Sequence, residues 1–497
     1  MADGSYWTYT YDAKGQIVSG TKYDSTNKAI PGQAFNYAYD DIGNLTSEQR
    51  GMTEMQFDYT SNLVNQYTQR LVPGIIPVTG QASADSTVSV WLKNHGANAA
   101  AVVRPTRDGE YFKAAIPVNN SAANVTEAIE ITAVKFNTTL DKDVVKTIDG
   151  NYTVPKTPQL FSYDDDGNMT GDGVWTYTWN GENQLIAIEQ AGKTKLELKY
   201  DYQGRRTEKK VYLWVSNTWS LTKYLKFAYD GYKQIAEYDG TAGTMQKNYI
   251  WQPEATGQDV PLWLNNGTST YYYIVDGNKN IRALADGTGA LTAKYEYGPF
   301  GEVLSKYGVM ADINPLRFSA EYFDSEIGLV YYNYRYYSPG LNRWISRDPI
   351  GEKGGKNLYG FLNNNVSNQW DVLGELPSTD FSKLQSLDCC EWDDYKLEQA
   401  RRQQAAWLAS VMQNYTKCKL KNTIGTVQDV ATCTGGCAVV CVYSTVYFKT
   451  CMALCEYACN QIADNLRGDC DSIRDSQLRD INFYMKGVVS AACKKWK

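Results

Sequence analysis

Aromatic and polar residues alternate in one short phrase that recurs along the first three quarters of the chain. The clearest copies are YTYDAKG at 9–15, YAYDDIG at 37–43 and FSYDDDG at 161–167. Residues two apart lie on one face of a strand, an Asp accepts hydrogen bonds from its own backbone at the start of a turn, and Gly supplies the positive φ that closes it. Each phrase therefore predicts two strands joined by a tight turn.

Weaker copies of the phrase follow at 200–204, 227–231, 275–277 and 295–301. A single hairpin cannot bury its aromatic face, so many hairpins must stack edge to edge into a long sheet. The spacing of the copies is too irregular to decide between a solenoid or propeller used as a spacer and a closed shell with an interior. The sequence thus predicts a mainly β chain and leaves both arrangements open.

Residues 70–160 interrupt the phrases with several short segments in which apolar and polar residues alternate between turn residues. This pattern predicts a small β-sandwich-like insertion. The only histidine of the chain, His95, falls in one of the expected turns of this insertion. We interpret it as a surface residue without a chemical role.

A longer and more specific pattern follows the last phrase. It consists of GLVYYNYRYY at 328–337, RWISRDPIG at 343–351, NLYG at 357–360 and DVLG at 371–374. Together with the Tyr-x-Tyr-Asp-x-x-Gly phrases and YEYGPFGEVL at 295–304, it resembles the RHS-associated core of YD-repeat or RHS proteins. That family includes bacterial polymorphic toxins and the C component of insecticidal toxin complexes.

The resemblance implies a β-shell, or cocoon, that encloses the protein's own C-terminal domain, and a core that plugs the shell and cuts the chain as an aspartic autoprotease. The family's two acidic residues fall on Asp348 and Asp371, and its supporting arginine falls on Arg335. The implied cut lies at or just after Gly374 or Glu375. The chain departs from the family at Val366 and Val372, where prolines are common, and at Glu375, where leucine is customary.

Two carboxyl groups can hydrolyse a peptide if they share one proton, because one then activates water while the other polarises the carbonyl. Arg335 would keep one carboxylate ionised or orient the carbonyl. Asp348 and Asp371 are far apart in sequence, so only the fold can bring them together. On local sequence alone, both DPIG and DVLG are also ordinary turn sequences in which the Asp caps its own backbone.

These patterns divide the chain into YD repeats at 1–69, the insertion at 70–160, further repeats at 161–304, the core at 305–375 and a variable C-terminal domain at 376–497. All eleven cysteines lie in this last domain, a density typical of disulfide scaffolds in exported proteins. An amphipathic helix is expected from Asp393 onward.

Two cysteine triplets recur every four residues and would each line one face of a helix: Cys433, Cys437 and Cys441, and Cys451, Cys455 and Cys459. Disulfides between two antiparallel helices are our preferred interpretation. A metal site is less favoured because zinc usually takes cysteine pairs on turns. Membrane contact by 431–459 is not favoured because each half is too short to span. A plain buried helical hairpin is the remaining alternative.

Charge and residue usage narrow the function classes. Residues 1–375 hold 34 basic and 42 acidic side chains and the remainder hold 15 and 13, so neither part has the strongly basic character that indicates nucleic-acid binding. The C-terminal domain has no histidine, which argues against histidine-dependent nucleases and Cys-His proteases. No cofactor or metal motif is found, and the activity and target of this domain stay open.

We therefore interpret the chain as the C-terminal part of a secreted, toxin-like RHS protein whose core releases an effector domain. The expected partners are its own C-terminal domain as enclosed cargo, an immunity protein or a component of a delivery system. No secretory signal is recognised at the N-terminus, and the first repeat begins without a cap, so we expect preceding sequence. The alternative is a non-enzymatic cell-surface or adhesion protein with an uncleaved core.

Overall fold

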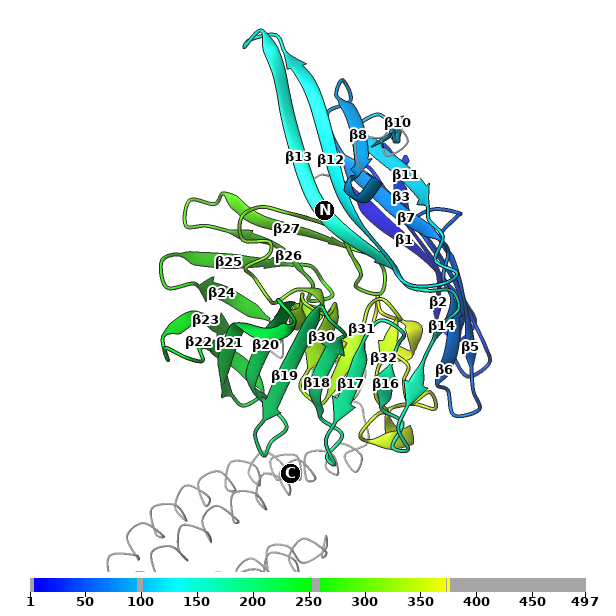
Figure 1. Cartoon of the computed structure of the whole chain (residues 1–497), viewed down its shortest axis with the longest axis vertical. Helices are drawn as coiled ribbons and strands as arrows, with labels where there is room; N and C mark the ends of the chain where they lie inside the picture. The colour runs from blue at the N-terminus through cyan, green and yellow to red at the C-terminus, as the bar shows by residue number, and fades with distance from the viewer. Residues whose placement is uncertain (1–3, 96–101, 253–259, 372, 376–497) are drawn as a thin grey trace, which may run out of the picture. The chain divides into compact units, whose positions relative to one another are not determined.

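The computed structural model describes residues 4–95, 102–252, 260–371 and 373–375. The chain divides into two compact units, Met1–Phe381 and Ser382–Lys497, and all described residues lie in the first. This unit is mainly β, which confirms the predicted fold class (Figure 1). The predicted C-terminal helices, both cysteine triplets and segment 431–459 lie outside the described residues. Among the described residues, no helix has the length and apolar character needed to cross a membrane.

The first repeats form an antiparallel sheet of seven strands, drawn in blue in Figure 1. Neighbours in sequence pair with each other, as expected for consecutive hairpins. Only the last strand comes from beyond the insertion. In order across the sheet the strands are β1 (Tyr6–Tyr11), β2 (Ile17–Tyr23), β3 (Ala29–Tyr39), β4 (Leu45–Arg50), β5 (Gln56–Ser61), β6 (Tyr67–Leu71) and β14 (Gln159–Leu160).

The later repeats form a second antiparallel sheet of fourteen strands, again in sequence order. Its strands are β15 (Ser162–Tyr163), β16 (Met169–Gly171), β17 (Thr176–Trp179), β18 (Leu185–Gln190), β19 (Thr194–Tyr200), β20 (Arg206–Val215), β21 (Thr218–Asp230), β22 (Lys233–Asp239), β23 (Met245–Trp251), β24 (Pro261–Asn265), β25 (Thr270–Val275), β26 (Ile281–Ala285), β27 (Leu291–Tyr297) and β28 (Val303–Tyr307).

The turn of each phrase is built as the sequence predicts. In the copy at 37–43, Asp40 Oδ1 accepts hydrogen bonds from the backbone N–H groups of Ile42 and Asn44, at 3.0 and 2.8 Å. Gly43 closes the turn with φ +89°, a conformation that favours glycine. The same arrangement recurs at Asp12, Asp164 and Asp201, and Asp276 makes the same hydrogen bonds in a turn that Lys279, with φ +64°, closes in place of a glycine. The Asp and the Gly of the phrase thus fix the hairpin register.

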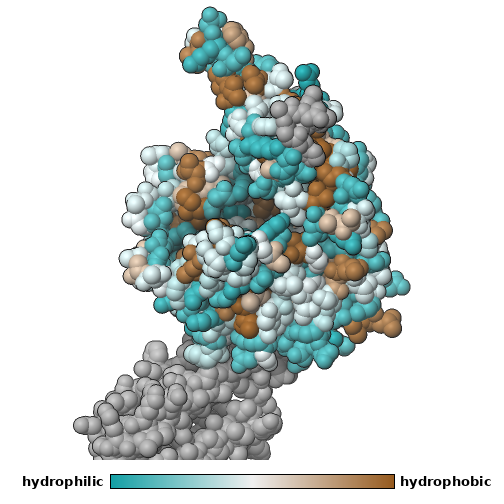
Figure 2. All heavy atoms as spheres, viewed as in Figure 1, coloured by the Kyte–Doolittle hydropathy of each residue, from teal (hydrophilic) through white to brown (hydrophobic). Residues whose placement is uncertain are grey.

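The predicted insertion forms two small sheets between β6 and β14. The first contains β10 (Thr106–Asp108), β11 (Tyr111–Pro117) and β7 (Ile75–Gln81), and the second contains β13 (Lys142–Val154), β12 (Val125–Asn137), β8 (Thr87–Leu92) and β9 (Val102–Val103), with the short turn η1 (Lys93–His95) after β8. The β12–β13 hairpin projects from the rest of the unit and carries exposed apolar side chains (Figure 2), among them Phe136, Leu140, Val144, Val145 and Ile148.

The core segment, drawn in yellow in Figure 1, contains a four-stranded sheet and three short 3-10 helices. These are η4 (Phe318–Ala320), β29 (Tyr322–Asp324), β30 (Leu329–Tyr332), β31 (Arg335–Ser338), β32 (Arg343–Trp344), η5 (Gly351–Gly354) and η6 (Leu362–Asn364). Buried aromatic rings of Tyr332, Tyr337, Trp344 and Phe361 pack against one another at the centre of this segment. Aromatic burial of this kind contributes most of the packing energy of a small core.

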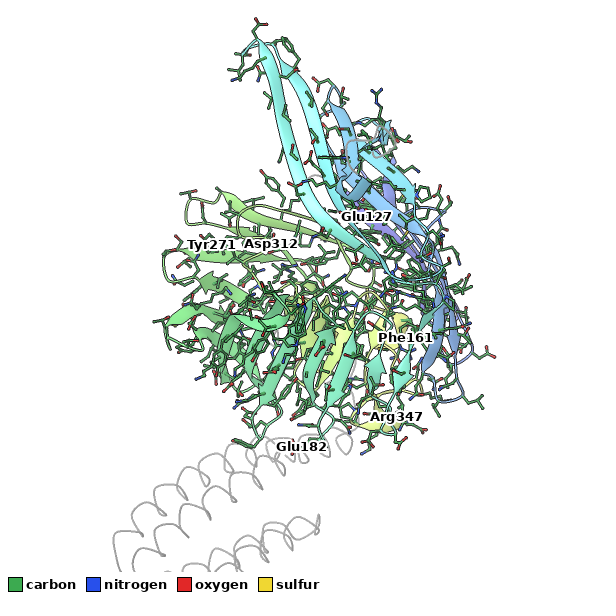
Figure 3. All side chains as sticks on the ribbon, viewed as in Figure 1. Glu127, Phe161, Glu182, Tyr271, Asp312 and Arg347 are labelled. Carbon is green, nitrogen blue, oxygen red and sulfur yellow. The ribbon has the colours of Figure 1, made fainter. Side chains whose placement is uncertain are left out.

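The core segment binds the turns of both large sheets. The Asn364 side-chain amide donates to Gly43 O at 2.9 Å, and the Tyr359 hydroxyl donates to Gly167 O at 2.7 Å. At the far end of the second sheet, the Asn278 side chain donates to Val366 O. Figure 3 places Arg347 of the core segment and Glu182 of the β17–β18 turn toward the same end of the unit. The core segment therefore ties the first repeats to the last.

Side chains also join the two sheets directly. Lys22 on β2 forms a buried ion pair of 2.8 Å with Glu296 on β27. Within the described ranges the two large sheets do not merge into one continuous barrel, since each keeps its own strand order. The sequence left open a solenoid or propeller used as a spacer and a closed shell, and the described residues form two separate sheets that the core segment and the buried Lys22–Glu296 ion pair join.

Candidate functional site

Arg335, Asp348 and Asp371 come from three separate parts of the core segment, and the fold brings them together. Arg335 is the first residue of β31. It pairs with Tyr332, the last residue of β30, across the two-residue turn that joins the two strands. Asp348 follows β32 by a few residues, and Asp371 comes after the loop that docks on the repeat turns. All three side chains are buried, with 3, 9 and 4% of their surface exposed.

Asp348 occupies the turn that its DPIG sequence predicts. Its Oδ1 accepts a hydrogen bond of 3.0 Å from the N–H of Ile350, and its carbonyl accepts one from the N–H of Gly351. The N–H of Asp348 donates to Leu358 O at 2.9 Å, which ties the turn to the following segment. One carboxyl oxygen is therefore used by the turn, while Oδ2 remains available to the site.

Asp371 likewise caps its own turn. Its Oδ1 accepts the N–H groups of Leu373, Gly374 and Glu375 at 3.1, 2.8 and 3.2 Å. The N–H of Tyr334 donates to Leu373 O at 3.1 Å and holds this turn against the β30–β31 hairpin. The structural interpretation of both Asp turns is thus correct, and it is compatible with a chemical role, because each turn uses only one oxygen of its carboxyl group.

Arg335 lies between the two remaining carboxyl oxygens. Its Nη2 is 2.9 Å from Asp348 Oδ2 and 3.8 Å from Asp371 Oδ2. Its Nε donates a hydrogen bond to the carbonyl oxygen of Gly374. The guanidinium stacks on the ring of Trp344, with its central carbon 4.1 Å from the ring centroid, and this contact fixes its plane. One cation therefore contacts both carboxyl groups and the backbone next to Glu375.

The electrostatics of this cluster are unbalanced. Burial raises the pKa of Asp348 to about 6, although Arg335 acts in the opposite direction. Burial also raises the pKa of Asp371, while Arg335 and the three backbone N–H groups lower it. One guanidinium can neutralise only one carboxylate, so a second buried carboxylate would lack a counter-charge. The pair is therefore set to hold one proton in mildly acidic solution.

The backbone at Glu375 reaches the same space. Glu375 is 2% exposed, and its carbonyl oxygen and Asp348 Oδ2 both lie within 3.0 Å of the position that a Cβ on Gly354 would occupy. The residues predicted as catalytic, Arg335, Asp348 and Asp371, and the residues predicted at the cut, Gly374 and Glu375, thus form one cluster. Whether they cleave the chain stays a prediction. Within the described residues, no group of three or more His, Cys, Asp or Glu side chains is arranged to hold a metal ion.

Two members of the cluster were not predicted from the sequence. Trp344 supports the guanidinium, and Gly354 leaves room beside the Asp348 carboxyl. The only signals for them were RWISRD at 343–348 and the paired glycines of EKGGK at 352–356. Neither sequence pattern indicates which residues Trp344 and Gly354 contact in the fold.

Comparisons with known proteins agree with the repeats and the core. A family model described as the Teneurin YD-shell matches residues 119–366. The chain is 31% identical over 245 residues to the tRNA nuclease WapA of Bacillus subtilis, which covers 46% of this chain and 10% of that protein. It is 24% identical over 420 residues to the toxin subunit YenC1 of Yersinia entomophaga, which covers 78% of this chain and 41% of that protein.

Among solved structures, the Photorhabdus luminescens Tc holotoxin pore with the TccC3-D651A mutation aligns with a TM-score of 0.37 and 16% identity, over 76% of this chain and 18% of that chain. The chain spans less than half the length of each of these relatives. The repeated phrases, the core segment and the family match over residues 119–366 together identify the chain as an RHS/YD-repeat protein, similar to the toxin subunit YenC1 and to the probable deoxyribonuclease RhsA of Dickeya dadantii.

Proposed function

We propose that the core at 305–375 is an aspartic-type autoprotease that cuts the chain beside Glu375 and so separates the YD-repeat unit from residues 376–497. The observation that carries the proposal is the buried Arg335 guanidinium, which contacts two carboxyl groups and the Gly374 carbonyl at once. A purely structural ion pair needs one carboxylate, and this cluster holds two.

The two carboxyl groups have different surroundings, which suggests their roles. Three backbone N–H groups favour the negative charge on Asp371, so the shared proton resides on Asp348. Asp348 Oδ2 and the Glu375 carbonyl oxygen lie 2.3 and 3.0 Å from the position that a Cβ on Gly354 would occupy, and a protonated Asp348 that reached the carbonyl would donate a hydrogen bond and polarise it. Asp371 would then act as the base.

The reaction is a hydrolysis in which atoms and charges balance. The Asp371 carboxylate takes a proton from water, and the water oxygen forms a bond to the Glu375 carbonyl carbon. The carbon–nitrogen bond to the next residue then breaks, and its nitrogen takes up a proton from the carboxyl pair. The products are a carboxyl group on Glu375 and an amino group on Leu376, and the carboxyl proton passes to the amino group, which leaves a carboxylate and an ammonium group while the aspartate pair keeps its one proton. Since the site and its substrate share one chain, even a slow catalyst completes its single turnover.

In this proposal the part of the chain after the cut is an effector, retained by the repeat unit as cargo and handed to a target by a secretion or delivery component. Support comes from relatives whose names describe different activities, a tRNA nuclease from Bacillus subtilis and a double-stranded DNA deaminase toxin from Burkholderia cenocepacia. The matches to these relatives span 46% of the chain each. An immunity protein against the effector is the expected second partner.

A non-enzymatic surface protein is the second candidate. It is favoured by one relative, the salivary gland surface protein 1 of Aedes aegypti, which is 27% identical over 238 residues. In that case the core would only tie the two sheets together, and the chain would stay whole.

N-terminal sequencing of the fragments of the purified full chain distinguishes these candidates. The autoprotease proposal expects a C-terminal fragment that begins at Leu376. A fragment that begins at Glu375 would move the cut to the Gly374 carbonyl, the one that Arg335 contacts. A chain that yields only its original N-terminus would favour the surface protein.

A further inference from the structure

The loop after Asp348 contains three glycines that are required for different reasons. Gly351 has φ +65° and Gly355 has φ +142°, values that residues other than glycine rarely adopt. Gly354 does not have a positive φ. Its backbone conformation is therefore open to any L-residue, and the reason for glycine must lie in the space around it.

That space is occupied on both sides. A Cβ on Gly354 would lie 2.3 Å from Asp348 Oδ2, 2.8 Å from Asp348 Cγ and 3.0 Å from the Glu375 carbonyl oxygen. These distances are shorter than van der Waals contact, so a methyl group would displace at least one of its neighbours. The missing side chain of Gly354 thus leaves open a space that both the Asp348 carboxyl group and the Glu375 carbonyl oxygen line.

Both neighbours are held in place. The Asp348 carboxyl is fixed through Oδ1 by the N–H of Ile350 at 3.0 Å and through Oδ2 by Arg335 at 2.9 Å. The Glu375 backbone is fixed by its N–H, which donates to Asp371 at 3.2 Å. A methyl group on Gly354 would therefore push Asp348 off Arg335 or move the Glu375 carbonyl away from the carboxyl pair.

We propose that Gly354 is a positioning residue of the cleavage reaction: it keeps open the gap in which the Asp348 carboxyl group reaches the Glu375 carbonyl. This inference rests on the proposed autoproteolysis. It assigns to EKGGK a role that local sequence does not indicate, since only Gly355 of its two glycines serves the turn conformation.

The test compares Gly354→Ala with two matched variants in the full chain. Gly340→Ala adds the same methyl group elsewhere in the core, where its nearest contact is Ser338 Oγ at 3.8 Å. Gly351→Ala strains the same loop through its positive φ but meets nothing within 4 Å. For each variant we would measure the rate of cleavage, its pH dependence and the midpoint of unfolding.

We expect Gly354→Ala to keep a cooperative unfolding transition at a lowered midpoint, because the methyl group disturbs a buried ion pair, and to cut at least ~100-fold more slowly, the cost of a misplacement of roughly 1 Å. Its residual cleavage should show a shifted pH dependence, because Asp348 has moved relative to Arg335. Gly340→Ala should cut within about twofold of the wild type, and Gly351→Ala should cut faster than Gly354→Ala.

Three results would overturn the inference. The first is a Gly354→Ala chain that cuts within about threefold of the wild type, which leaves the autoprotease intact and removes only the role of Gly354. The second is equal slowing in Gly351→Ala, or loss of the unfolding transition in Gly354→Ala, since either makes Gly354 a folding residue. The third is a wild-type chain that does not cut, which removes the proposed function as well.

Discussion

Two buried arginines, Arg206 on β20 of the second sheet and Arg335 on β31 of the core segment, have similar surroundings and differ in charge balance. Each is nearly inaccessible to solvent, with 0 and 3% of its surface exposed. Each stacks on aromatic rings: Arg206 lies 4.5 Å from the Tyr331 ring and 4.7 Å from the Tyr322 ring, and Arg335 lies 4.1 Å from the Trp344 ring. The difference lies in the carboxyl groups that face them.

The Arg206 cluster is balanced. Arg206 Nη1 contacts Asp324 Oδ2 at 2.5 Å, and Lys209 contacts Asp324 Oδ1 at 2.6 Å and Glu326 at 2.7 Å. Although burial alone would raise the pKa of Glu326, Lys209 and Lys223 lower it to about 2. Two carboxyl groups here face at least two cations, so each has a counter-charge.

The Arg335 cluster has one cation for Asp348 and Asp371, whose pKa values are both raised, and the buried Glu375 adds a third acidic side chain near the same guanidinium. The comparison indicates that a buried arginine stacked on aromatic rings can have either of two roles, depending on how many carboxyl groups face it. A guanidinium on aromatic rings with a matched set of charges joins strands, whereas the same guanidinium with an extra carboxyl group holds a transferable proton. The predictions below test this contrast.

The largest effect is expected at the two carboxyl groups. Asp348→Asn and Asp371→Asn should each slow cleavage by ~10²–10⁴-fold or abolish it, because an amide can neither take nor give the proton. The turns should survive, since an Asn side-chain oxygen also accepts backbone hydrogen bonds. Time courses on denaturing gels measure the rate. Asp286→Asn, in an exposed repeat turn, is the control and should cut normally.

The next effect concerns the stability of the balanced cluster. Arg206→Ala should lower the free energy of unfolding by about 3–5 kcal/mol, since it leaves Asp324 buried without its arginine. Denaturant titration measures this change. If the free energy of unfolding falls by less than about 1 kcal/mol, the Arg206 cluster does not stabilise the contact between the second sheet and the core segment.

A pH dependence follows from the raised pKa of Asp348. Its proton is lost as the pH rises through about 6, so the rate of cleavage should fall across this range. The same group contributes stability that is fully present below its ordinary pKa near 3.8 and is lost as the pH rises through about 6. Cleavage rates and unfolding midpoints between about pH 4.5 and 8 measure both. A rate that rises with pH through 6 would assign the shared proton to another group.

The smallest effect is expected at Trp344. Trp344→Leu removes the stacking partner of Arg335 and should slow cleavage by roughly tenfold, in line with a cation–π contribution of about 1–2 kcal/mol. Arg335→Lys should slow it more, because lysine cannot contact both carboxyl groups and the Gly374 carbonyl at once. Equal rates in Trp344→Leu and the wild type would mean that the two carboxyl groups alone hold the guanidinium.

The sequence predicted the features that depend on local chemistry. Tyr-x-Tyr-Asp-x-x-Gly defines strand, turn and strand, and the Asp hydrogen bonds at Asp40 and the positive φ of Gly43 follow directly. It also singled out Asp348 and Asp371, which the fold brings to one guanidinium. Local sequence could not predict the features that depend on distant contacts, such as the ion pair of Lys22 with Glu296 or the gap at Gly354.

Two of the departures from the family pattern, at Val366 and Glu375, lie within the described residues, whereas Val372 lies outside them. Val366 is 2% exposed, and its carbonyl accepts the Asn278 side chain, an interaction that a proline would also allow because it uses only the carbonyl. Glu375 stands in place of the customary leucine and is buried. Burial lowers the pKa of Arg335, and the nearby Glu375 acts in the opposite direction. The site thus carries one more acidic side chain than the resemblance implied.

The mass of the denatured full chain, followed over time near pH 5.5, tests the central claim most directly. The account predicts that the 55.8 kDa chain is replaced by two fragments that meet after Glu375, and that an Asp371→Asn chain stays whole under the same conditions. A wild-type chain that keeps its full mass throughout, or an Asp371→Asn chain that is cut as fast as the wild type, would contradict it.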